Sequence, residues 1–134
     1  MSKGYLLDTS ALLAYMEKEA GDERVKSILK NENVLIPWTA LTELFYITCR
    51  KKGGDIAELR YAMLKRSGAH IIWQADEFVL ISAGRIKAFH RVSFADAIIA
   101  SFAVKYNTIL VHKDPEYEAL IGQLEMEALP YKND

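Results

Sequence analysis

The sequence predicts an α/β fold in which helices cover both faces of a central parallel sheet. Short apolar runs alternate along the chain with longer segments whose apolar residues recur at helical spacing. The chain has 134 residues, 51% of them hydrophobic, and no linker-like stretch, so residues 1–134 fit one domain with a substantial core. Strands that alternate with helices pair in parallel, so we expect a parallel sheet.

The first predicted strand is the apolar run at residues 5–7, which stops abruptly at an aspartate. Asp8, Thr9 or Ser10 could cap the helix predicted over residues 11–16, since a side-chain oxygen there accepts hydrogen bonds from free backbone N–H groups. For a single aspartate, this structural role is the simplest interpretation.

The remaining elements follow from the same two periodicities. Pro37 closes a strand, Gly68 ends a helix, and Pro130 is tolerated only if the last strand lies at an edge of the sheet. The other predicted helices cover residues 22–30, 39–52, 55–67, 76–90 and 93–106, with a short one after Pro115. The other predicted strands cover residues 33–37, 69–74, 108–112 and 126–131.

Composition excludes several classes of protein. No apolar run approaches the roughly 20 residues that span a bilayer, and the N-terminus lacks a secretory signal pattern, so we expect a cytoplasmic protein without a membrane segment. The single cysteine, Cys49, cannot form an internal disulfide and is expected to pack in the core. The net charge of −1 means that any binding of nucleic acid would require basic residues gathered locally.

Four acidic residues occupy unusual positions. Asp8 and Asp114 follow predicted strands, so both are expected at the carboxyl edge of the sheet, where ligands bind in such folds. Asp96 and Glu43 lie within otherwise apolar helices, where an unpaired charge is costly. Each has a structural alternative: Asp8 and Asp114 as helix caps, Asp96 in a capping box with Ser93, and Glu43 either paired with an arginine in the core or pointing through a gap to solvent.

Taken together, the four carboxylates lack a matching number of cations nearby in sequence, and a divalent metal ion would supply the missing charge. Oxygen-only ligands favour Mg²⁺ or Mn²⁺. Zinc fits poorly, because the histidines show no paired spacing and Cys49 stands alone. Mg²⁺ chemistry at such a site is suited to hydrolysis of phosphodiester bonds.

The segments LLDTSALLAYM, TALTELFY and SFADAIIASFAVKYNTILVHKDPEYEAL resemble the PIN-domain nucleases, and most of all the VapC-type ribonuclease toxins. The resemblance covers nearly the whole chain. It implies a three-layer α/β/α sandwich, Mg²⁺- or Mn²⁺-dependent cleavage of single-stranded or structured RNA, a homodimer, and inhibition by a small antitoxin protein. The residues that match the metal-binding and catalytic acids of the family are Asp8, Glu43, Asp96 and Asp114. Ser10 matches a hydroxyl residue that accompanies the first aspartate.

The region of the last acid departs from the family pattern. His112 stands where many relatives have threonine, and Glu116 and Tyr117 replace an aspartate and a phenylalanine. Either Asp114 or Glu116 could therefore supply the fourth carboxylate.

Two basic clusters are candidates for contact with RNA phosphates. Arg50, Lys51 and Lys52 end one helix, where they also complement its dipole. The second cluster precedes Asp96, and within it Lys87 and Arg91 share one helical face, so these two are the preferred candidates. Trp38 could stack on an unpaired base, or lie in the core.

Two other classes remain open. A receiver-type phosphoacceptor domain also places acids at strand ends, but the run at residues 69–74 ends without an aspartate. The other is a catalytically silent PIN-like module that binds RNA or protein.

Overall fold

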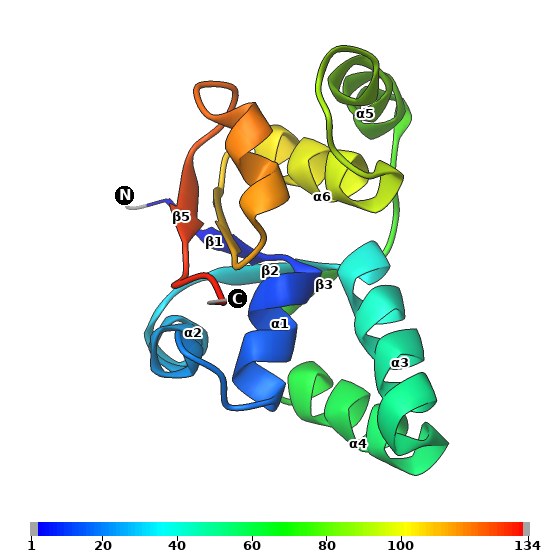
Figure 1. The fold of residues 1–134 in the computed structure, drawn as a ribbon, viewed down its shortest axis with the longest axis vertical. Coiled ribbons are helices and arrows are strands. Elements are labelled where there is room, and N and C mark those ends of the chain that lie inside the picture. The colour runs from blue at the N-terminus through cyan, green and yellow to red at the C-terminus, as the bar shows by residue number, and fades with distance from the viewer. Residues whose placement is uncertain (1–2, 133–134) are drawn as a thin grey trace.

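In the computed structural model, which describes residues 3–132, five strands form one parallel sheet in the order β3-β2-β1-β4-β5 (Figure 1). The strands are β1 (Tyr5–Leu7), β2 (Val34–Pro37), β3 (His70–Ile72), β4 (Ile109–His112) and β5 (Met126–Ala128). The helices are α1 (Thr9–Met16), α2 (Asp22–Asn31), α3 (Trp38–Lys52), α4 (Gly54–Lys65), α5 (Glu77–Phe89) and α6 (Phe94–Lys105), followed by the 3₁₀ helix η1 (Pro115–Leu120).

The helices form two layers, one on each face of the sheet, which confirms the predicted three-layer α/β/α sandwich. Helices α1 to α4 connect β1 to β2 and β2 to β3, and they lie on one face (Figure 1). Helices α5 and α6 then return the chain to β4, and they lie with η1 on the other face. The chain changes face because it reverses its direction across the sheet and each parallel crossover keeps the same hand.

This reversal makes the boundary between β1 and β4 the topological switch point of the sheet. The two strands are hydrogen-bonded neighbours, with Leu7 opposite Val111, and the connections that follow them leave towards opposite faces. A crevice therefore opens beyond their carboxyl ends, which is where ligands bind in open α/β sheets. Asp8 directly follows β1, and Lys113 and Asp114 follow β4.

The core holds these two strand ends rigidly. Leu6 and Leu7 of β1 and Leu110 and Val111 of β4 are fully buried, as expected for central strands covered on both faces. Helix α6 is buried around most of its circumference, since three alanines (Ala97, Ala100 and Ala103) allow close approach of the sheet and of neighbouring helices. Side chains that begin at these ends are consequently fixed by close-packed surroundings.

Several predicted elements differ in detail. The strands predicted over residues 69–74 and 126–131 are shorter, and Pro130 lies beyond the β5 edge strand rather than within it. Cys49 is a free, half-buried cysteine outside the buried core cluster. Trp38 is 40% exposed, so it is a surface residue and not part of the core. No helix among residues 3–132 is long and apolar enough to cross a membrane.

Candidate functional site

Asp8 serves as the cap of α1 and also lies at the switch point. Its side chain is 1% exposed and accepts hydrogen bonds from the backbone N–H of Ala11 (2.8 Å) and from the hydroxyl of Ser10 (2.8 and 2.9 Å to the two oxygens). Burial nevertheless raises the pKa of Asp8 from 3.8 to about 7, and the charge of Asp114 adds to the increase. The capping hydrogen bonds lower this pKa, but the effect of burial outweighs them.

Asp96 occupies the first turn of α6. Its backbone N–H donates to the hydroxyl of Ser93 (3.1 Å), which confirms the predicted cap, while its carboxylate accepts a hydrogen bond from Tyr117 Oη (3.1 Å). The residue is 8% exposed. Burial raises the pKa of Asp96 well above its ordinary value, and a hydrogen bond shared with Glu116 and the charges of Asp8 and Asp114 act in the same direction.

Asp114 and Glu116 complete a compact group of acids with Asp96. One carboxylate oxygen from each of the three residues lies within 4.8 Å of the other two. Asp114 also caps η1 by accepting the N–H of Glu116 (2.9 Å). The interaction with Asp96 lowers the pKa of Glu116, whereas the same interaction and burial raise the pKa of Asp96. We refer to Asp96, Asp114 and Glu116 as the acid triad.

Glu43 lies outside the acid triad. Its Oε1 accepts a hydrogen bond from the hydroxyl of Thr9 (2.6 Å), so α1 fixes the position of a carboxylate on α3. The resemblance to the PIN-domain nucleases predicted Glu43 as one of four metal-binding acids, and this prediction remains untested. Glu116, the predicted alternative to Asp114, lies with both Asp96 and Asp114. Thr9 was considered only as a cap, because no local pattern links it to a residue 34 positions later in the chain.

Ser10 joins the two strands of the switch point. Besides donating to Asp8, its hydroxyl accepts a hydrogen bond from the backbone N–H of Lys113 (2.7 Å). Since both roles of the hydroxyl are already taken, Ser10 positions Asp8 and the segment after β4.

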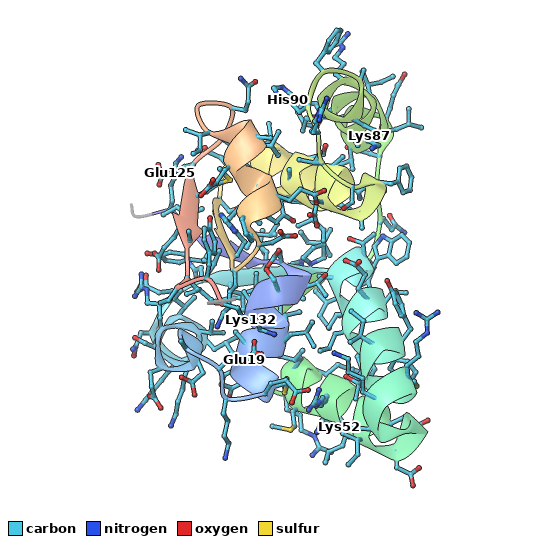
Figure 2. All side chains as sticks on the ribbon, viewed as in Figure 1. Glu19, Lys52, Lys87, His90, Glu125 and Lys132 are labelled. Carbon is cyan, nitrogen blue, oxygen red and sulfur yellow. The ribbon has the colours of Figure 1, made fainter. Side chains whose placement is uncertain are left out.

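Lys87 and Arg91, the two preferred candidates for phosphate contact, differ in their surroundings. Lys87 Nζ donates to the carbonyl of Val92 (2.8 Å), and its charge helps to lower the pKa of Glu116, so it lies near the acid triad. Arg91 is exposed. Figure 2 shows Lys87 and His90 at the α5 end of the molecule, far from Lys52 at the end of α3.

The acid triad has the donor set that a hard divalent cation requires. All three groups offer carboxylate oxygens, and across residues 3–132 neither the triad nor Asp8 forms an ion pair within 4.0 Å. Burial is the main cause of the raised pKa values of Asp8 and Asp96, and the neighbouring carboxylates add to it. Such a group fits Mg²⁺ or Mn²⁺, which bind through a few carboxylates and retain water molecules.

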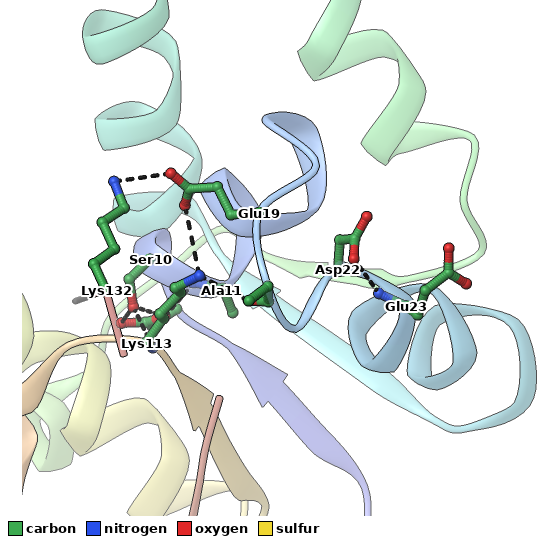
Figure 3. A network of polar contacts seen from close by, with 9 residues as sticks. Ser10, Ala11, Glu19, Asp22, Glu23, Lys113 and Lys132 are labelled. Atoms are coloured by element: carbon green, nitrogen blue, oxygen red, sulfur yellow. Dashed lines mark hydrogen bonds and ion pairs between the residues drawn. The ribbon is translucent and has the colours of Figure 1, made fainter. Parts of the chain in front are cut away.

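A cleft of about 620 Å³ extends from the site along α1. Ser10 and Asp114 line one part of it. Four lysines also line it (Lys51, Lys52, Lys113 and Lys132), together with Glu17 and Glu19. Figure 3 shows Lys113 and Lys132 converging on Glu19. From the sequence, the cluster at residues 50–52 was the second candidate for phosphate contact. Lys113 and Lys132 could not be predicted, because their proximity depends on the packing of β4 and the C-terminal segment.

The fold and the site together define a class: three-layer α/β domains with a group of carboxylates at the switch point of a parallel sheet. The sequence matches the PIN domain family over residues 5–121. The chain therefore belongs to the PIN domain family, as its sequence motifs predicted.

Solved structures of VapBC and VapC proteins have the same fold. They include VapBC2 of Rickettsia felis bound to a promoter DNA fragment (TM-score 0.76, 20% identity, 94% of this chain and 98% of the other covered). DNA-bound VapBC of Salmonella typhimurium is similar (TM-score 0.73, 19% identity, 95% of this chain and 98% of the other covered). VapC20 of Mycobacterium tuberculosis, described as a toxin that cleaves the sarcin-ricin loop, is also similar (TM-score 0.70, 17% identity, 87% of this chain and 94% of the other covered). No curated protein matches the chain by sequence.

Proposed function

We propose that this protein is a metal-dependent endoribonuclease that hydrolyses phosphodiester bonds of single-stranded or structured RNA. The observation that carries the proposal is the acid triad, whose three oxygens lie within 4.8 Å at the switch point without a neutralising cation among the described residues. Membership of the PIN domain family and the structural similarity to VapC toxins support it.

The acid triad would hold Mg²⁺ or Mn²⁺, with Asp8 as the adjoining carboxylate. The bound cation supplies charge that neutralises the phosphate and the leaving oxygen, and it acidifies water. The chain's own residues prepare this geometry. Ser10 orients Asp8, Tyr117 orients Asp96 through its hydroxyl, and the backbone of η1 holds Asp114. Fixed groups of this kind need little reorganisation when charge develops on the substrate.

We further propose that the protein is the toxin of a toxin-antitoxin pair, that it acts in the cytoplasm where its RNA substrate occurs, and that it forms a homodimer. The support for an antitoxin partner is that several similar structures are VapBC complexes.

Cleavage of a labelled single-stranded RNA tests the proposed activity. We expect cleavage by the parent protein in Mg²⁺ or Mn²⁺, none in excess chelator, and none by an Asp8→Asn variant prepared identically, since replacing Asp8 removes a carboxylate from the switch point. Full activity in chelator would refute metal dependence. An intact RNA with every metal would favour the catalytically silent module.

The Thr9–Glu43 hydrogen bond provides a second test. We expect Thr9→Val to lower the cleavage rate about tenfold, because Glu43 loses the donor that fixes its carboxylate, while the loss of one hydrogen bond costs about 1 kcal/mol of folding stability. Thr39→Val is the matched control. The Thr39 hydroxyl is buried without a hydrogen-bond partner in the described part of the chain, so this change should leave cleavage unaltered. Equal rates for both variants would show that Glu43 does not contribute.

A further inference from the structure

The cleft beside the acid triad contains more cations than its acids neutralise. Three carboxylates line the cleft against four lysines, and two of the three, Glu17 and Glu19, each lie close to two cations. Glu17 accepts a hydrogen bond from Arg60 (3.0 Å) and lies 3.8 Å from Lys52. Glu19 lies 2.8 Å from Lys132 and 4.0 Å from Lys113. The local charge is therefore positive although the whole chain has a net charge of −1.

The lysines of the cleft differ in how tightly they are held. Lys113 has a side chain only 4% exposed, and its Nζ donates to the carbonyl of Ala20 (2.7 Å), so it acts as a fixed charge at the back of the cleft. Lys52 is exposed and only loosely paired with Glu17. Lys51 is exposed and forms no ion pair within 4.0 Å of any residue from 3 to 132.

We propose that this cleft binds the RNA backbone next to the cleaved bond, with Lys51 and Lys52 as phosphate contacts. The inference rests on the proposed nuclease function and assigns its substrate path. The cleft is continuous with the acid triad, because Asp114 belongs to both, so a strand whose phosphate lies at the triad enters it directly. Exposed amines can exchange a weak carboxylate partner for a phosphate, and release of counterions from the RNA favours this exchange.

The other basic candidate near the triad is less suited to this contact. The amine of Lys87 is already bonded to the carbonyl of Val92, whereas Lys51 and Lys52 lie at the end of α3 with their amines available. Lysines at a helix C-terminus also complement the helix dipole, a purely structural role. Arginine preserves both the dipole interaction and phosphate binding, whereas alanine removes both, so thermal melts must accompany the binding measurements.

The test measures RNA affinity as a function of salt concentration in an Asp8→Asn background, with Mg²⁺ present, so that cleavage does not interfere. Lys51→Ala/Lys52→Ala is compared with Lys26→Ala/Lys30→Ala, which removes two exposed lysines of α2 outside the cleft. For a single strand, the loss of two phosphate contacts should reduce the slope of log affinity against log salt by about 1.4 units. At 0.1 M salt this corresponds to roughly 25-fold weaker binding.

The outcomes separate this inference from the proposed function. A reduced slope for the α3 variant, with a parental slope for the α2 control and for Lys51→Arg/Lys52→Arg, supports the assigned path. A parental slope for Lys51→Ala/Lys52→Ala overturns the assigned path, even where the parent protein cleaves RNA. The cleft would then bind another ligand, such as an acidic peptide. If the slope is reduced but the parent protein, with Asp8 intact, cleaves no RNA, the result supports the cleft as an RNA-binding site and refutes the nuclease function.

Discussion

An Asp96→Asn variant is expected to cleave RNA at least about 100-fold more slowly than the parent in Mg²⁺ or Mn²⁺. Asp96 is the most buried member of the acid triad, and its carboxylate accepts a hydrogen bond from Tyr117. Asparagine keeps the shape of the side chain but removes the negative charge that a divalent cation requires. Initial rates measured over a range of metal concentrations should show that the variant needs more metal to reach half of its maximal rate, and that this maximal rate is lower.

The matched control for this change is Glu118→Gln. Glu118 lies on the same 3₁₀ helix as Glu116 but is exposed and outside the acid triad. The Glu118→Gln variant loses one negative charge, as Asp96→Asn does, so it shows how much a change of charge alone affects RNA binding. We expect its rate to stay within about threefold of the parent. If Asp96→Asn cleaves as fast as this control, the acid triad is not the catalytic site.

The second large effect concerns the stability of the metal-free protein. In chelator, the melting temperature of the parent should fall as pH rises from about 4 through neutrality. Asp8 and Asp96 have an ordinary pKa of 3.8, whereas in the folded protein burial raises the pKa of Asp8 to about 7 and that of Asp96 higher still. Across this range the folded state binds more protons than the unfolded state, so the stabilisation is complete below pH 4 and is lost as pH rises through the folded pKa values.

Each carboxyl contributes a slope of up to about 1.4 kcal/mol per pH unit within its window. Asp96→Asn removes one contribution, so the variant should melt near the parent at pH 4 and several degrees above it at pH 8. Added Mn²⁺ should raise the melting temperature of the parent more than that of the variant, since metal binding stabilises the folded state.

A purely structural role for Asp96 predicts the opposite sign. Weakening a carboxylate in the first turn of α6 would cost about 0.3 to 1 kcal/mol at neutral pH. A variant that melts below the parent at pH 8, together with a parent that gains nothing from Mn²⁺, would therefore identify the acids as caps and refute the metal site.

The layers and most of the site acids were predictable because their signals are local. Asp8 ends an apolar strand, and Asp96 stands alone in an apolar helix, so each is conspicuous without knowledge of its neighbours. All three capping alternatives were also correct: Asp8 accepts the N–H of Ala11, Asp114 accepts that of Glu116, and Ser93 accepts that of Asp96. A cap and a ligand group are compatible, since the crevice forms where helices begin.

The choice between Asp114 and Glu116 as the fourth carboxylate could not be made from the sequence, and the structure groups both with Asp96. This grouping depends on the direction in which the short 3₁₀ helix turns after β4, and the identity of Asp114 and Pro115 does not determine that direction. The cleft lined by Lys51, Lys52, Lys113 and Lys132 could not be predicted from the sequence for a related reason. Its walls come from α1, α3, the segment after β4 and the C-terminal segment, which only the assembled fold brings together.

The position of Lys132 has a practical consequence for handling the protein. This residue, close to the C-terminal end of the described chain, lies against Glu19 on the wall of the cleft, whereas Lys3 lies at the amino ends of the strands beside Glu125. A purification tag or surface tether attached after Lys132 would hang over the mouth of the cleft and compete with any ligand there. One attached before Lys3 would emerge beyond the amino ends of the strands, so immobilisation and labelling should use that end of the chain.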